Sequence, residues 1–129
     1  MSNTIAEYYK DELIDWNHAI TFHDEEISEL EKKLGEVIRR NGIIDIASKV
    51  EAQQKLLDQV ADKFYRLQIE FQEQENVLRT DHTYIDNAFI NNETEIRQAE
   101  LRRKVEALEK EYISIKYDCY NFLSGTLKK

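Results

Sequence analysis

The sequence predicts an all-α protein in which three long amphipathic helices pack as an antiparallel, up-down-up, coiled-coil-like bundle. Three observations support this fold class. The 129 residues include no proline and only three glycines, and 34% of them are charged, as is typical of long helices. Apolar residues recur at alternating steps of four and three, the spacing of helices that pack against one another. Two short breaks cut the chain into stretches of matched length, so we expect a single domain over residues 1–129.

The first helix is expected over residues 5–41. Thr4 and Glu7 have the spacing of a capping box, in which a hydroxyl and a carboxylate bind free amides of the first turn. Two arginines followed by Asn41 and Gly42 predict its end, because cations favour a helix C-terminus and glycine readily takes positive φ. Its seam, the row of residues facing the other helices, is Tyr9, Leu13, Trp16, Ile20, His23, Ile27, Leu30, Leu34 and Val37.

The second helix is expected over residues 45–80, with Asp45 as its N-cap. The heptad pattern fades near residues 80–83, which carry turn-forming side chains but neither glycine nor proline. The seam of this helix is Ile46, Val50, Gln53, Leu57, Val60, Phe64, Leu67, Phe71, Gln74 and Leu78.

The third helix is expected over residues 84–124, ending before Gly125. Its apolar residues form two rows. The first row is Ile85, Phe89, Asn92, Ile96 and Ala99, and the second is Leu101, Val105, Leu108, Tyr112, Ile115, Cys119 and Phe122. Because the rows do not join, we expect a local change of supercoil near residues 96–101. A short basic tail, Lys128 and Lys129, follows the helix.

Two other arrangements of this region stay open. The third helix could start at Asn92, with Glu95 as its capping partner, which would leave residues 81–91 as a short linking helix. Alternatively, the second and third helices form one continuous rod, which would need a partner chain to cover its apolar seam.

Four polar residues occupy or adjoin the seam and are expected in the core: His23, Gln53, Gln74 and Asn92. Matching positions by height along antiparallel helices places Gln74 level with Asn92. We expect these two amides to pair and to fix the register of the helices. His23 lies in the middle of its helix, level with Phe64, and is expected to be a hydrogen-bonded core histidine.

His23 and Glu26 are also weak candidates for a metal site, because residues three apart share a helix face. Di-iron bundles require Glu-x-x-His on two helices and two further glutamates. The expected second helix contains no histidine. We therefore expect no metal and no cofactor.

Sequence features of catalytic sites are missing. The lone Cys119 lies far in height from a histidine, and the chain has no Gly-rich phosphate loop, no cysteine pair and no Asp-rich calcium loop. Cys119 is expected to be a small apolar seam residue. The basic run at residues 102–104 is flanked by glutamates and is expected to be a solvated face. We expect that the protein is not an enzyme.

The last part of the third helix is apolar nearly all the way round. Together with the first turn it would form an apolar end of the rod, and exposed apolar patches usually mark association surfaces. The expected partner-binding residues are Ile113, Tyr117, Tyr120 and Leu123 of the third helix, with Ile43 and Ile44 at the first turn. The alternative is that a broader core at this end hides most of these side chains.

The composition opposes several classes of function. The net charge of −8 repels phosphate backbones and anionic lipid surfaces, so we expect neither nucleic-acid nor membrane binding. No apolar run approaches the roughly 20 residues needed to span a bilayer. The first residues lack the pattern of a signal peptide, and a single cysteine cannot form an internal disulfide, so we expect a cytoplasmic location.

The sequence therefore favours a non-enzymatic structural or protein-interaction module. It would act as a rigid helical spacer or adaptor that binds a protein partner or associates with itself through the Gly42/Phe122 end. One alternative is a small-molecule or metal-binding bundle centred on His23. A second alternative is an acidic assembly or secretion chaperone.

Overall fold

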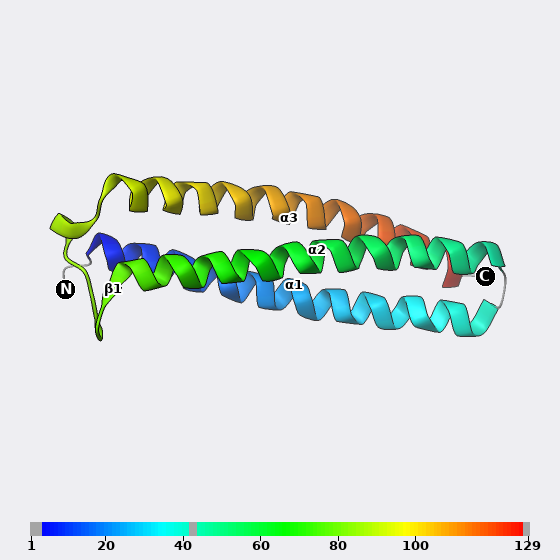
Figure 1. The fold of residues 1–129 in the computed structure, drawn as a ribbon. Coiled ribbons are helices and arrows are strands. Elements are labelled where there is room, and N and C mark those ends of the chain that lie inside the picture. Colours follow the sequence, from blue (N-terminus) through cyan, green and yellow to red (C-terminus); the bar gives the residue numbers. More distant parts are fainter. Residues whose placement is uncertain (1–3, 42–43, 128–129) are drawn as a thin grey trace.

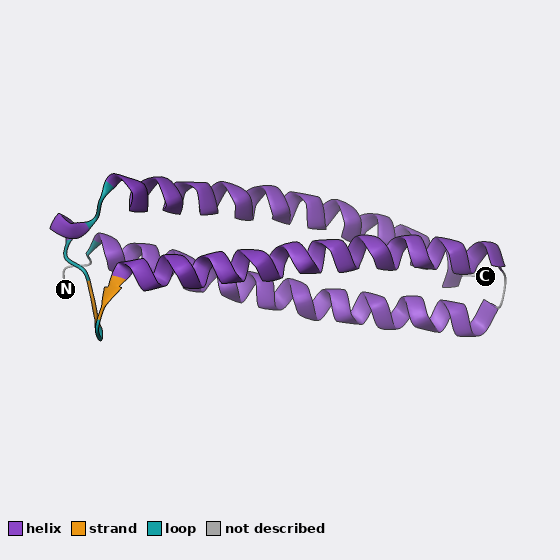
Figure 2. Ribbon diagram, in the orientation of Figure 1, coloured by secondary structure: helices purple, strands orange, loops and turns teal. Residues whose placement is uncertain are grey.

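The structure, a computed structural model, describes residues 4–41 and 44–127. Its three α-helices are α1 (Ile5–Asn41), α2 (Ile44–Leu78) and α3 (Asn92–Leu127). They lie side by side as an elongated rod, with the short linker between α2 and α3 at one end (Figures 1 and 2). The predicted all-α three-helix bundle is confirmed.

Contacts between side chains give the direction in which each helix runs. Higher-numbered residues of α1 meet lower-numbered residues of α2, so these two helices are antiparallel, and the same holds for α2 and α3. Residue numbers rise together along α1 and α3, so these helices are parallel. The contacts are Trp16–Phe71 and His23–Phe64 between α1 and α2, Lys63–Glu111 and Glu70–Lys104 between α2 and α3, and Glu12–Arg102 and Glu26–Lys116 between α1 and α3.

The core follows the predicted heptads of the first two helices. Every aliphatic seam residue from Leu13 to Val37 is buried, and Tyr9 and Trp16 pack partly buried against them. In α2 the aliphatic and phenylalanine seam residues from Val50 to Leu78 are buried as well. Removing this apolar surface from water is the main force that holds the three helices together.

The start of α1 also follows the prediction. The Glu7 amide donates to Thr4 Oγ1 at 3.1 Å, and the Thr4 hydroxyl donates to the Glu7 carboxylate at 3.2 Å. This local pairing satisfies a free amide of the first turn. The helix ends at Asn41 as expected, while Gly42 and Ile43 lie outside the described residues.

The linker between α2 and α3 differs from the prediction. α2 ends at Leu78, and the chain forms a small hairpin of β1 (Arg79–Thr80) and β2 (Thr83–Tyr84). Asp81 takes a positive φ of 57°, a conformation that aspartate tolerates in turns. The Ile85 amide then donates to the Leu78 carbonyl at 2.9 Å. Residues 79–80 of the predicted second helix and residues 84–91 of the predicted third helix are thus not α-helical.

A single 3₁₀ turn, η1 (Asn87–Phe89), precedes α3, so residues 81–91 do not form a linking helix either. α3 begins at Asn92, which is the alternative start considered above, but the capping residue is Asn91. Asn91 Oδ1 accepts hydrogen bonds from the amide and the hydroxyl of Thr94, at 2.8 and 2.9 Å. Asn91 therefore caps a free amide in the first turn of α3, the role expected of Asn92.

The predicted change of supercoil near residues 96–101 is wrong. Thr94 and Gln98 are buried and continue the row that starts again at Leu101, so one seam runs through the whole of α3. Ile96, which was assigned to the seam, is 49% exposed. The two polar seam residues concealed this continuity from a reading based on hydrophobicity.

Candidate functional site

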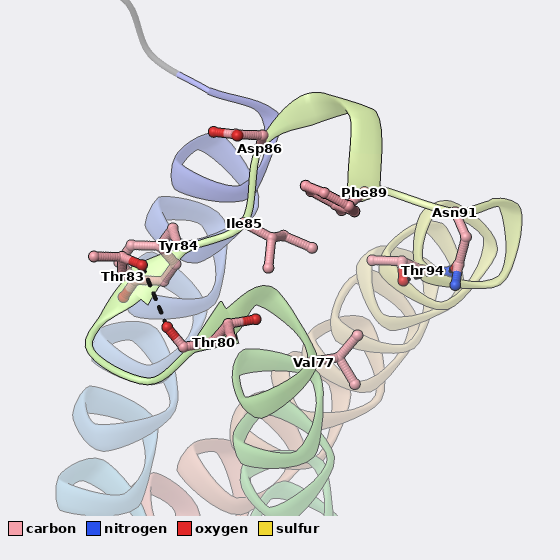
Figure 3. Close-up of a pocket in the computed structure, with 9 residues that line it drawn as sticks. All are labelled: Val77, Thr80, Thr83, Tyr84, Ile85, Asp86, Phe89, Asn91 and Thr94. Carbon is pink, nitrogen blue, oxygen red and sulfur yellow. Dashed lines mark hydrogen bonds between the residues drawn. The ribbon is translucent and has the colours of Figure 1, made fainter.

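A pocket of about 590 Å³ lies where the linker folds against the end of α2 and the start of α3. Val77 of α2, Ile85 of the irregular segment after β2 and Phe89 of η1 project into it (Figure 3). The remaining lining residues are Thr80, Thr83, Tyr84, Asp86, Asn91 and Thr94. Phe89 is 70% exposed, so its ring forms an open apolar wall. The pocket can accept an apolar group, and its size is in the range of ligand pockets.

Polar contacts hold the linker in place against α1 and α2. Asn87 Oδ1 accepts a hydrogen bond from the Ile5 amide at 2.8 Å, so the linker caps the first turn of α1. The Tyr84 ring lies 5.5 Å from Lys10 Nζ of α1 and 5.2 Å from the Arg79 guanidinium of β1, and its hydroxyl donates to Glu75 of α2 at 3.4 Å. The linker that connects α2 to α3 therefore also contacts the start of α1. This pocket was not predicted, because Thr80 was assigned to the second helix and residues 84–91 to the third.

The predicted docking residues of α3 fall into two groups. Ile113, Tyr117 and Tyr120 are exposed by 45%, 62% and 39%, and their spacing of four and three places them on one face. Leu123 is only 4% exposed and belongs to the core, so its assignment to a docking surface is wrong. Ile43 and the side chain of Ile44 lie outside the described residues. We call Ile113, Tyr117 and Tyr120 the α3 stripe.

His23 lies half-buried at the middle of the bundle. Its ring stacks on Phe64 at 5.4 Å between centroids, the level that the heptads predicted, and contacts Tyr112 at 4.8 Å. Nε2 is 2.9 Å from Glu109 Oε2. Nδ1 is buried without a hydrogen-bond partner and lies 3.7 Å from Glu26 Oε1. The ring is thus hydrogen-bonded on one side and joins all three helices.

Glu26, the other weak metal candidate, is engaged by α3. Its carboxylate accepts hydrogen bonds from the Tyr112 hydroxyl at 2.9 Å and from Lys116 Nζ at 2.8 Å. Burial raises the pKa of Glu26, but the hydrogen bonds from Lys116 and Tyr112 outweigh it and leave the pKa lowered. Within the described part of the chain, no three His, Cys, Asp or Glu side chains are arranged to hold a metal ion. The cluster is arranged as a network of hydrogen bonds between helices.

A second polar network crosses the core near the linker. Gln74 is buried as predicted, but its Nε2 donates to Gln98 Oε1 and to the Thr94 carbonyl, both at 3.1 Å. Asn92 is exposed, so the predicted Gln74–Asn92 pair is wrong. The late start of α3 moves each of its residues by more than a turn relative to α2. Gln98 therefore stands at the level assigned to Asn92.

The network continues into α1. Gln98 Nε2 donates to the Tyr9 carbonyl at 3.2 Å and to Glu12 Oε1 at 3.0 Å. Arg102 donates two further hydrogen bonds to the same Glu12 carboxylate. Buried amides and a shared carboxylate thus connect the three helices at this level. Gln53, the remaining polar seam residue, is half-buried, and its Oε1 has no hydrogen-bond partner.

Glu31 of α1 and Asp58 of α2 form a pair of interacting carboxyl groups. Burial, followed by hydrogen bonding to Asp58 and repulsion from its charge, raises the pKa of Glu31 to about 7. The heptad analysis missed this pair, because both residues lie beside the seam. The two carboxyl groups meet because of how far each helix is rotated about its own axis.

Cys119 is buried, as expected of a seam residue. Burial raises the pKa of its thiol to about 11, which disfavours the reactive thiolate near neutral pH.

The chain matches no protein-family model, no curated protein and no solved structure. None of the described helices is both long and apolar enough to cross a membrane.

Proposed function

We propose that this protein is a non-enzymatic interaction module, a rigid helical spacer that associates with a second copy of itself through the α3 stripe. The observation that carries the proposal is the exposure of Ile113, Tyr117 and Tyr120 on one helical face. Large apolar and tyrosine side chains gathered on a surface are characteristic of protein interfaces.

The surroundings of the stripe favour a second copy as the occupant. Ser114, Asn121 and Ser124 are exposed beside it, and Lys110 and Asp118 are exposed charged residues at its borders. The chain carries a net charge of −8, which opposes association of two copies through most other surfaces. An antiparallel, two-fold pairing centred on Tyr117 would place Ile113 of each copy near Tyr120 of the other.

The spacer role is supported by packing along the whole rod. Helices of 35 to 37 residues correspond to a rod roughly 55 Å long at 1.5 Å per residue. Cross-helix hydrogen bonds lie near the linker, at Gln98, and in the middle, at Glu26. Such contacts resist the sliding of one helix along another.

Size-exclusion chromatography with light scattering tests the proposal. We expect a dimer at tens of micromolar protein and a monomer for Tyr117→Glu, because the substitution places two like charges at the centre of the interface. Tyr65→Glu is the matched control, since Tyr65 is similarly exposed, at 61%, on α2. This control should remain dimeric. A native protein that is monomeric up to about 100 µM would overturn the proposal.

A further inference from the structure

We infer that the outer face of α1 is a docking surface for a basic amphipathic helix of a partner protein. The face consists of Asp11, Ile14, Asp15, His18, Phe22 and Glu25, and we call it the acidic face. It lies on a different helix from the α3 stripe, so the inference does not depend on self-association.

The apolar part of this face is a ridge of three side chains. Ile14, His18 and Phe22 are each four residues apart and therefore follow one line along the helix. Ile14 is 40% exposed and Phe22 is 57% exposed, and His18 is exposed between them. A partner helix that covered this ridge would remove apolar surface from water.

The ridge is bordered by three acidic residues: Asp11 pairs with Lys10 of the same helix, and the charges of Asp15 and Glu25 are left uncompensated within the part of the chain that the structure describes. Residues 11–31 contain eight Asp and Glu residues and no Lys or Arg. On the inner side of α1, Glu12 and Glu26 are paired with Arg102 and Lys116 of α3. Among the described residues, Asp15 and Glu25 on the outer side are exposed and have no ion-pair partner within 4.0 Å.

Charge decides which occupant fits. A second copy of the face would bring acidic residues against acidic residues, and phosphate-bearing surfaces would be repelled in the same way. A helix with apolar residues on one side and Lys or Arg on both flanks matches the ridge and its borders. Its apolar residues would pack on Ile14 and Phe22, and its cations would pair with Asp15 and Glu25.

The test uses a fluorescent, Lys- and Leu-containing amphipathic peptide of about 18 residues, which is long enough to cover the face at 1.5 Å per residue. Binding is measured by fluorescence anisotropy at low and at physiological salt. A scrambled peptide of the same composition controls for attraction by net charge alone. We expect the amphipathic peptide to bind at least about tenfold more tightly than the scrambled one.

Protein variants locate the binding to the face. Phe22→Ser should weaken binding about tenfold, and the double variant Asp15→Lys/Glu25→Lys should weaken it at least as much. The matched controls are Tyr65→Ser and Glu51→Lys on the exposed surface of α2, which should leave binding unchanged. Circular dichroism verifies that each variant stays helical.

Equal binding of the two peptides, or binding that is indifferent to both α1 variants, would overturn the inference. The molar mass of each α1 variant is measured at the same time. Because the α3 stripe is intact in these variants, their dimer should persist. Loss of peptide binding with an unchanged dimer therefore supports the acidic face, whereas a monomer with intact peptide binding refutes only the proposed self-association.

Discussion

Glu12 of α1 accepts two hydrogen bonds from Arg102 of α3, at 2.9 and 2.6 Å. The contact joins the two helices that the chain does not connect directly. Glu12 lies toward one end of the sequence and Arg102 toward the other. Because a planar guanidinium matches the two oxygens of a carboxylate, this contact holds α3 at one height along α1.

Arg102→Lys tests the contribution of this contact. Lysine keeps the charge but cannot form the two-pronged contact, so we expect the free energy of unfolding to fall by about 1 kcal/mol. Urea unfolding followed by circular dichroism measures it. Arg103→Lys, at the exposed neighbouring position, should leave the free energy unchanged. Equal losses of unfolding free energy for Arg102→Lys and Arg103→Lys would show that the two-pronged contact with the Glu12 carboxylate contributes nothing specific.

Gln74→Leu and Gln98→Leu test whether the two buried amides act together. Each single substitution leaves a buried polar partner unsatisfied and should cost about 1–3 kcal/mol. The double variant removes both amide groups, so it should cost less than the sum of the two single substitutions. Additive costs in chemical unfolding would argue against coupling of the hydrogen bond between Gln74 and Gln98.

Glu31→Gln tests the effect of the carboxyl pair on stability. The pKa of Glu31 is raised from 4.5 in the unfolded chain to about 7 in the folded protein. The folded state therefore binds more protons in this window, and stability falls as the pH rises from about 4.5 to 7. Glutamine cannot ionise, so the variant should lose this part of the pH dependence.

At pH 8 we expect Glu31→Gln to be more stable than the native protein by on the order of 1 kcal/mol, a value that allows for solvent screening of this half-exposed site. Below pH 4.5, where Glu31 is protonated in both states, the difference should vanish. Thermal unfolding across this pH range provides the measurement. Glu29→Gln, an exposed neighbour, is the control, and an identical profile for both variants would contradict the prediction.

Asn91→Ala tests the start of α3. Removal of the side-chain oxygen that accepts from the Thr94 amide should lower the free energy of unfolding by about 1 kcal/mol. Asn92→Ala changes an exposed residue that lacks this role and should be close to neutral. If denaturant unfolding showed a larger loss of stability for Asn92→Ala than for Asn91→Ala, the assignment of Asn91 as the N-cap would be wrong.

The heptads predicted the core of α1 and α2 because apolar side chains occupy nearly every seam position there. The same criterion was correct from Leu101 onward in α3 but failed in its first turns, where Gln98 lies in the seam and Ile96 faces solvent. Hydrophobicity cannot distinguish a buried, hydrogen-bonded glutamine from an exposed one. The break after the second helix was correctly placed near Asp81, but its extension through a hairpin strand and a 3₁₀ turn to Asn91 was not foreseen.

The errors in the polar core follow from that turn. Height matching depends on where each turn lies, so a late start of α3 changes the partner of Gln74 from Asn92 to Gln98. The position of His23 against Phe64 was predicted correctly, because the first turn was placed correctly at the end of α1. The exposure of Phe22 and Tyr117 depends on how far each helix is rotated about its own axis. The spacing of apolar residues in the sequence determines this rotation only in part.

The hydrogen bond from the Ile5 amide to Asn87 has a consequence for the order of folding. The two residues are separated by 82 positions in the sequence. Such non-local contacts form late, because they are rewarded only after the chain between them has closed. The opening turn of α1 is thus completed by a segment synthesised long after it. Hydrogen exchange at the Ile5 amide should accordingly be among the last signals to gain protection on refolding, and it would report that the linker has docked.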